Sequence, residues 1–304
     1  MKLVTKDLQE GYVLAEDVYA LANDPLMVAG TVLTNDLIKI LNVFLIPTVE
    51  IIDLEEKERL EKIEKETTAR VRKEEGSLYS QWTDTYKKML QKYQSGGKID
   101  IFAVRRFFVP IIEHVLEDEK KFFQYYKSFN EEEYFPQHQI AVGMLAARLG
   151  KELGYSSGDC VQLGLSGLFA DVGMIRISSK IYNKKTSLTS NEKREINKHP
   201  VYSYEMIKEI PSLTEEAMLG VLQHHEREDG LGYPLKLKKE NATYFSKIIA
   251  VSDVFVALIA DRPYQEKKTM FEALEIMNVQ EKGKYNKKVL DQLTNLIIGY
   301  VRTI

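Results

Sequence analysis

Cysteine and histidine are scarce in this 304-residue chain, and neither sign of charge predominates. The single cysteine, Cys160, excludes an internal disulfide and fits a reducing compartment, so we expect a cytoplasmic protein. The net charge of −3 gives no general attraction to nucleic acid or to an anionic membrane. The most apolar stretch, residues 248–260, is too short to span a bilayer and contains Asp253, and the first residues lack the apolar core of a signal peptide. We therefore expect neither nucleic acid nor a membrane as partner.

The composition divides the chain into three parts. Residues 1–52 hold strand-like runs, a turn at Gly30 and an apolar helical segment with Asn35 as its cap, which predicts a small α/β module. Residues 53–97 are mostly charged helix formers and predict a helical connector, with a coiled-coil seam as the alternative. Across residues 98–304 apolar residues recur every three or four positions, which predicts helices. The predicted fold is therefore mainly α, a helical bundle preceded by a small α/β amino-terminal domain.

Four of the five histidines alternate with aspartates at regular steps in the helical part. The intervals 138–171, 171–199, 199–224 and 225–253 are 33, 28, 25 and 28 residues long, each about one helix, a turn and the start of the next helix. A bundle built in this way can direct one side chain from each helix at a central point. A single histidine would more often be structural, and His114, outside the pattern, is treated so. The pattern as a whole predicts a metal site made of six residues: His138, Asp171, His199, His224, His225 and Asp253.

The residue types in this set indicate which metal is expected. Imidazole and carboxylate ligands without a cysteine thiolate favour Fe or Mn. Two such ions about 3.5–4 Å apart can hold a phosphodiester between them and ionise a bridging water.

Several motifs extend the pattern over about residues 125–300. The most specific is HHEREDGLGYP at residues 224–234, and it is accompanied by KHP at 198–200, SDVFVALIADRPY at 252–264 and GKYN at 283–286. In order and spacing these segments resemble the HD-GYP family, helical metal-dependent phosphohydrolases of the HD superfamily that typically cleave cyclic di-GMP. Residues 1–52 are similar to an amino-terminal module that often precedes such domains.

The resemblance implies a role for each residue of the site. Asp171 would be the catalytic carboxylate that bridges both ions, and the other ligands would divide between a second site, with His199, His224 and His225, and a first site, with His138 and Asp253.

Two further residues would contact the substrate. Arg262 would grip a phosphate with two hydrogen bonds, and Tyr233 would stack on or hydrogen-bond the ligand. For Tyr233 the alternative is a loop residue that only packs the turn.

Three positions depart from the family pattern. Ala170 stands where the His–Asp doublet has its histidine, so we expect one strong and one weakened metal site. Met174 stands where a lysine is usual, and Val256 where another acid is usual. When a buried cation and the acid that pairs with it are both replaced by apolar residues, no unpaired charge is left in the interior. The joint replacement at positions 174 and 256 therefore indicates that the pocket has been repacked. Milder departures are the loop KKTSLT at residues 184–189 and Gln265.

These matches and departures leave two functions open. The favoured one is a divergent HD-GYP-like protein of bacterial cyclic-dinucleotide signalling, which binds metal and cyclic di-GMP or a related phosphate ester, has weak or no phosphodiesterase activity, and acts through protein signalling partners. The alternative is an active metal-dependent cyclic di-GMP phosphodiesterase that forms linear pGpG or GMP. A scaffold with an empty pocket is disfavoured because the four histidines are in place.

Overall fold

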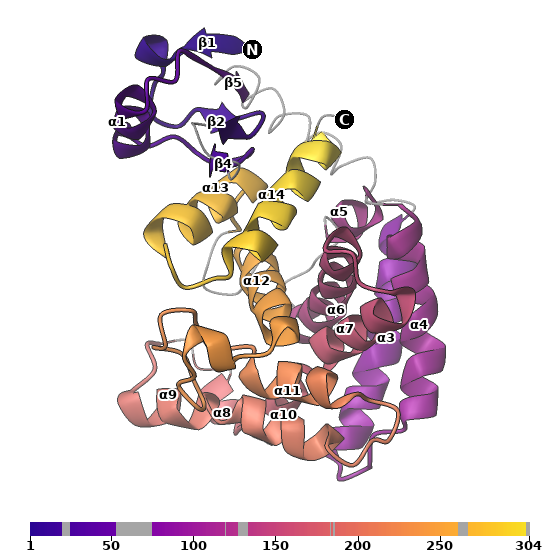
Figure 1. Cartoon of the computed structure of the whole chain (residues 1–304). Coiled ribbons are helices and arrows are strands. Elements are labelled where there is room, and N and C mark those ends of the chain that lie inside the picture. The colour runs from indigo at the N-terminus through magenta and orange to yellow at the C-terminus, as the bar shows by residue number, and fades with distance from the viewer. Residues whose placement is uncertain are drawn as a thin grey trace.

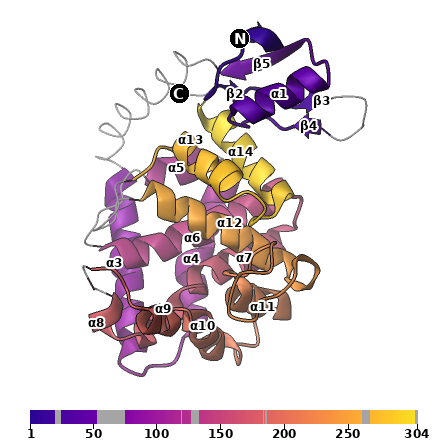
Figure 2. The same cartoon turned by 90° about the vertical axis from the view of Figure 1, so that its left-hand side faces the viewer.

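The computed structural model describes residues 1–19, 25–52, 75–118, 120–126, 133–182, 184, 186–260 and 267–301. Helices dominate these residues, and a small α/β unit lies at one end, above the last helix (Figures 1 and 2). The predicted fold class, mainly α with a small α/β amino-terminal part, is confirmed.

The described residues of the amino-terminal unit form two small antiparallel sheets, one α-helix and one 3-10 turn. Its elements are β1 (Lys2–Val4), η1 (Thr5–Asp7), β2 (Val13–Leu14), β3 (Val18–Tyr19), β4 (Pro25–Met27), α1 (Asn35–Val43) and β5 (Thr48–Ile52). One sheet has the order β1-β5-β2, with Lys2 opposite Glu50 and Val13 opposite Ile52, while β3 pairs with β4. The helix cap predicted at Asn35 is one residue earlier, because the Thr34 side chain accepts the N–H of Leu37.

The remaining elements are helical. They are α3 (Glu75–Gln94), α4 (Ile101–Glu117), α5 (Lys120–Tyr126), α6 (Tyr134–Glu152), α7 (Ser157–Phe169), η3 (Val172–Arg176), α8 (Ser179–Tyr182), α9 (Ser190–Ile196), α10 (His199–Ile207), α11 (Glu215–Gln223), η4 (Lys239–Asn241), α12 (Tyr244–Ile259), α13 (Met270–Glu275), the π-helical turn η5 (Ile276–Gln280) and α14 (Lys287–Val301). In the described parts of the chain, no helix combines the length and apolar character needed to cross a membrane.

Helices α6 and α7 form a tightly packed hairpin at the centre of the bundle. Glycines make the close approach possible, because a Cβ on Gly167 would lie 2.7 Å from the Cα of Gly143. Ser156 starts α7 by accepting the N–H of Asp159. The hairpin places His138, near the start of α6, and Asp171, just after α7, at the same end of the bundle.

Helix α3 packs into this core although its sequence belongs to the predicted connector. The Tyr79 hydroxyl donates to the carbonyl of Gln137 at 2.7 Å, and the Tyr86 hydroxyl donates to that of Leu168 at 3.0 Å. Residues 53–74 of the connector lie outside the described residues. The division of the chain at residues 52 and 97 therefore stays a prediction.

The amino-terminal unit contacts α14. Its residues Val13, Val32 and Ile52 belong to the same hydrophobic cluster as the helices, whereas a second cluster lies within the unit itself. Gly30 has a φ of 78°, and a Cβ at this position would overlap the methyl group of Thr294. The absence of a side chain at Gly30 thus allows the unit to approach the helix.

Candidate metal centre

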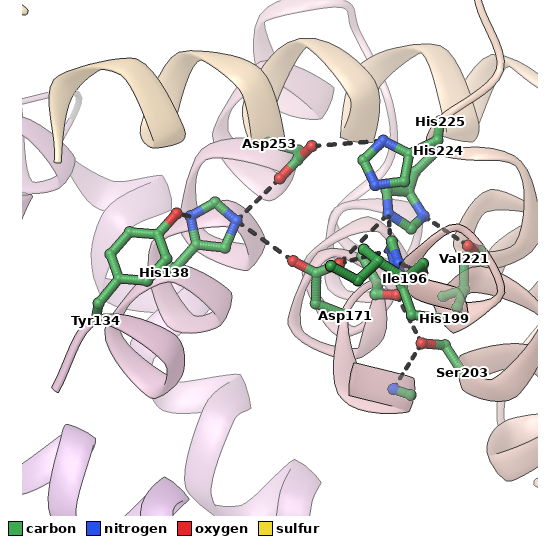
Figure 3. Close-up of polar contacts among 12 residues, drawn as sticks. Tyr134, His138, Asp171, Ile196, His199, Ser203, Val221, His224, His225 and Asp253 are labelled. Atoms are coloured by element: carbon green, nitrogen blue, oxygen red, sulfur yellow. Dashed lines mark hydrogen bonds and ion pairs between the residues drawn. The ribbon is translucent and has the colours of Figure 1, made fainter. Parts of the chain in front are cut away.

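The structure brings the six predicted side chains to one place (Figure 3). They come from separate elements: His138 from α6, Asp171 from the turn after α7, His199 from the first residue of α10, His224 and His225 from the end of α11, and Asp253 from the middle of α12. They form two groups with Asp171 in common: Asp171 with His199, His224 and His225, and His138 with Asp171 and Asp253.

The spacing of the donor atoms matches that of metal ligands. Within each group the donor atoms lie within 4.8 Å of one another. Ligands about 2.0–2.3 Å from one ion can be at most about 4.6 Å apart, so each group is close to the size that a single ion requires. We therefore call the first group the four-ligand group and the second the three-ligand group.

The four-ligand group is built around the Asp171 carboxylate. Its Oδ1 lies 3.0 Å from His199 Nε2 and 3.6 Å from His224 Nε2, and these two nitrogens are 3.3 Å apart. The His225 ring lies 4.1 Å from the His224 ring and perpendicular to the His199 ring. All three imidazoles therefore face the same small volume.

Backbone carbonyls fix the tautomers of two of these histidines. His199 Nδ1 lies 2.8 Å from the carbonyl oxygen of Ile196, and His224 Nδ1 lies 2.7 Å from that of Val221. Because a carbonyl only accepts hydrogen bonds, both Nδ1 atoms carry the proton. In the neutral rings each Nε2 then presents a lone pair to the other and to Asp171, an arrangement that a metal ion or a proton between them would stabilise.

The three-ligand group is centred on His138. Its Nε2 lies 2.9 Å from Asp253 Oδ1 and 3.5 Å from Asp171 Oδ2. The Tyr134 hydroxyl, one helical turn earlier, lies 3.2 Å from His138 Nδ1, and the two rings stack. Tyr134 was not singled out in the sequence, although its position four residues before a predicted ligand places it on the same helix face.

The surroundings of the site favour an ionised Asp171 carboxylate and protonated rings of His138 and His199. Burial opposes ionisation of Asp171, but hydrogen bonds with His138, His199 and His224 hold the pKa of its carboxyl well below the usual range. Burial also works against the charge of His138 and His199, but their hydrogen bonds to Asp171 raise the pKa of both rings. Burial and the neighbouring His224 lower the pKa of His225 well below its usual range. His225 is thus held in its neutral, ligand-competent form.

Ser203 of α10 holds the Asp171 segment in place. Its hydroxyl donates to the carbonyl of Ala170 at 2.7 Å and accepts the N–H of Gly173 at 2.8 Å. A Cβ on Gly173 would overlap the carbonyl oxygen of His199. The small residue at position 173 therefore lets the segment that carries Asp171 lie directly against the start of α10.

The loop that contains the GYP residues folds back over His225. The N–H of Tyr233 donates to the carbonyl of His225 at 3.1 Å, and the Tyr233 ring stacks on the His225 ring at 4.6 Å. A Cβ on Gly232 would lie 2.5 Å from backbone atoms of the preceding turn. Burial, followed by the charges of Asp253 and Asp171, raises the pKa of Tyr233, which keeps its hydroxyl protonated.

Glu226 anchors the end of this loop and was missed in the sequence. Its buried carboxylate accepts the backbone N–H groups of Leu235 and Lys236 on one oxygen and that of Leu237 on the other, at 2.6–3.1 Å. The available signal was its position directly after the histidine pair, where a carboxylate that is not a ligand needs another partner.

The structure describes most of the other residues singled out in the sequence, but not all of them. Ala170 is buried at the end of α7, Met174 is half-buried and Val256 is completely buried. His114 lies outside the site, with its Nε2 2.8 Å from the Tyr125 hydroxyl. Arg262, the predicted phosphate contact, and Gln265 lie outside the described residues.

Comparisons with known proteins agree on the class of domain. A sequence model of the HD domain family matches residues 110–289. Over 161 residues the chain is 33% identical to cyclic di-GMP phosphodiesterase PdeB of Borreliella burgdorferi, which covers 53% of this chain and 42% of the relative. It is 30% identical to 3'3'-cGAMP-specific phosphodiesterase 3 of Vibrio cholerae over 47% of this chain and 31% of the relative. The chain thus spans less than half the length of both curated relatives.

One solved structure has a similar fold over the whole chain. Bd1817, an HDG"Y"P protein from Bdellovibrio bacteriovorus, superposes with a TM-score of 0.61 over 98% of this chain and 99% of its own, at 13% sequence identity. At this identity the likeness concerns the fold alone.

Proposed function

This chain belongs to the HD domain family, and on that premise we propose that it binds a divalent metal ion, Fe or Mn, in the four-ligand group and a second ion more weakly in the three-ligand group. The observation that carries the proposal is the pair of Nε2 atoms of His199 and His224, 3.3 Å apart, with the nearest Asp171 oxygen beside them. Both rings donate their Nδ1 proton to the backbone, so their free nitrogens point at the same volume.

We propose a cyclic dinucleotide as the ligand, cyclic di-GMP or a related phosphate ester. Support comes from the relatives, whose names specify cyclic di-GMP or 3'3'-cGAMP. Bound metal supplies Lewis acidity to a phosphodiester and lowers the pKa of a coordinated water. Asp171 provides the carboxylate shared by both groups, Tyr134 orients His138, and Tyr233 and Arg262 are the proposed contacts to the nucleotide.

We further propose that turnover is weak or absent. Ala170 offers a methyl group where the family resemblance implies a histidine ligand, so the three-ligand group keeps only His138, Asp171 and Asp253. Met174 replaces the lysine expected nearby. Loss of one such electrostatic contribution costs roughly 10²–10³ in rate. In that case the domain would act by binding nucleotide and signalling to protein partners.

The alternative proposal is an active phosphodiesterase. It is favoured by the four-ligand group, which contains every ligand that the resemblance implies for it, and by Tyr233, which lies against His225 at the edge of the site.

Metal analysis combined with a turnover assay tests these proposals. The full chain would be purified without chelator, its metal content measured, and hydrolysis of cyclic di-GMP and 3'3'-cGAMP followed with added Mn or Fe. We expect about one tightly held ion per chain and slow or undetectable hydrolysis, and His199→Ala should lose the ion. A chain that holds no metal under any of these conditions would refute the proposed site, whereas rapid hydrolysis would favour the alternative.

A further inference from the structure

A cavity of about 680 Å³ lies between the amino-terminal unit and the carboxyl-terminal helices. None of the six proposed metal ligands lines it. Its size is within the range of about 300–1,000 Å³ typical of small-molecule sites. One wall is mostly apolar and comes from the amino-terminal unit, including Met27 of β4 and Leu37 and Ile40 of α1. The opposite wall comes from η5 and α14, including Val279 and Leu290.

Two of the acidic side chains that line the cavity already have cationic partners. Asp36 lies 2.8 Å from Lys39. Glu228 lies 3.0 Å from Lys239 and 3.2 Å from Lys247. Their charges are therefore largely offset before any ligand enters.

Three other ionisable groups in the cavity wall, Lys282, Lys287 and Asp291, make no salt bridge within the described part of the chain. Asp291 is half-buried, and burial raises the pKa of its carboxyl to about 6. The nearby Lys287 opposes this shift, so the charges of Lys287 and Asp291 largely offset each other at neutral pH. Lys282, together with the second of the two lysines at Glu228, then leaves the cavity with an excess of positive charge.

We propose that this cavity binds a small amphipathic anion, with its apolar body between α1 and η5 and its carboxylate, sulfonate or similar group at Lys282 and Lys287. Apolar lining with a few polar groups at one side is the arrangement that binds such molecules. The amino-terminal unit would then serve as one half of a ligand site whose other half belongs to the helical domain.

Two contacts, made by Tyr285 and Arg227, connect the cavity to the proposed metal centre. Tyr285 lines the cavity, and the Arg227 guanidinium lies over its ring, 5.2 Å from the centroid. Arg227 in turn donates to the carbonyl of His224 at 3.0 Å. We infer that occupation of the cavity changes metal affinity along this route; this second step rests on the proposed metal function, whereas ligand binding does not.

Fluorescence titration with 8-anilinonaphthalene-1-sulfonate (ANS), an aromatic sulfonate of the proposed class, tests the binding step on the full chain without metal. Val279→Trp places a large ring in the cavity wall, and the matched control Val43→Trp adds the same ring to α1 outside it; the two valines are 36% and 76% exposed. We expect about tenfold weaker binding for Val279→Trp, equivalent to about 1.4 kcal/mol, and an unchanged affinity for the control. Ile40→Trp, on the opposite wall, replaces Val279→Trp if that variant does not fold.

A second set of variants tests whether the two lysines in the cavity wall contribute to ANS binding. The double variant with Lys282→Ala and Lys287→Ala should bind ANS about three- to fivefold more weakly. The expected effect is small because exposed ion pairs are individually weak. Lys288→Ala, which removes a neighbouring exposed lysine that does not line the cavity, should change affinity less than twofold. Several ANS molecules bound per chain with the same affinity in all variants would refute the site.

The connection is tested by measuring Mn affinity with and without saturating ANS. We expect a change of about fivefold or more, and the same factor in ANS affinity when Mn is saturating, because such coupling is reciprocal. ANS binding at the cavity without a change in Mn affinity would refute the connection alone. A chain that binds ANS but no Mn would instead refute the proposed metal function.

Discussion

The Nε2 atoms of His199 and His224 face each other at 3.3 Å, while the Nδ1 atom of each ring is held by a carbonyl three residues earlier in the chain. Two lone pairs in a buried space repel each other unless a positive charge lies between them. In the metal-free protein a proton can take that place, which agrees with the raised pKa of His199. A metal ion would relieve the same repulsion without a proton.

Addition of Mn should therefore stabilise the chelator-treated protein. At a free concentration about 100 times the Kd we expect a gain of about 2.7 kcal/mol in the free energy of unfolding, measured by urea denaturation. His224→Ala should abolish the gain, whereas His138→Ala should reduce it only in part because it belongs to the three-ligand group. His114→Ala, outside the site, should keep the gain in full. Equal losses in the His138 and His224 variants would contradict a strong and a weak site.

Glu226→Gln should loosen the loop after the GYP residues. The substitution removes the negative charge that accepts three backbone N–H groups, so we expect a loss of about 2 kcal/mol in the free energy of unfolding. Hydrogen exchange at the amides of Leu235 and Leu237 should become faster. Glu240→Gln, at an exposed position in η4, is the matched control and should change neither quantity. Unaltered exchange in Glu226→Gln would show that the charge does not hold the loop.

The six candidate ligands could be predicted from the sequence, whereas the role of Glu226 could not. Helical periodicity predicted the bundle because apolar spacing determines which helix face is buried. The six candidate ligands could be selected because histidine is rare in this chain and alternates with aspartate at regular steps. Glu226 could not, since its role depends on three backbone N–H groups about ten residues away, whose directions follow from the folded loop. The cavity beside α14 could not be predicted either, because it depends on how the amino-terminal unit packs against the carboxyl-terminal helices.

Asp291→Asn should alter the pH dependence of stability. Burial raises the folded-state pKa of Asp291 from the usual 3.8 to about 6. Its contribution to stability is therefore complete below about pH 4 and is lost as the pH rises through about 6, because the folded state must then ionise a partly buried carboxyl. At pH 7.5 we expect the variant to be more stable than the wild type by about 1 kcal/mol, a value reduced for partial solvation, with no gain near pH 4.

Asp36→Asn provides the control of opposite sign for this experiment. The hydrogen bond from Lys39 lowers the pKa of Asp36, so its contribution to stability is present at neutral pH and is lost as the pH falls. Urea denaturation at several pH values should therefore give differences from the wild type that change in opposite directions for the two variants. The same direction in both would show that burial does not govern the titration of Asp291.

Substitutions at positions 174 and 256 should be coupled if these residues replaced an ion pair as a unit. Met174→Lys alone should destabilise the protein by about 1–2 kcal/mol, because it adds a cation without an acid to receive it. Val256→Asp alone should cost about 3 kcal/mol or more, since Val256 is completely buried. In the double variant the two charges can pair, so the combined loss should be smaller than the sum by well over the roughly 0.5 kcal/mol expected of independent sites.

Ile175→Lys combined with Val256→Asp is the matched control for this cycle, because Ile175 is the half-buried neighbour of Met174 in η3. This pair should show much weaker coupling if the position of the cation matters. Ala170→His, added to the double variant with Met174→Lys and Val256→Asp, should then raise metal occupancy in the three-ligand group, because a fourth ligand strengthens the site. Only that triple variant should gain phosphodiesterase activity over the wild type. Strictly additive effects at 174 and 256, or rapid hydrolysis by the unmodified chain, would show that these positions were never a functional pair here.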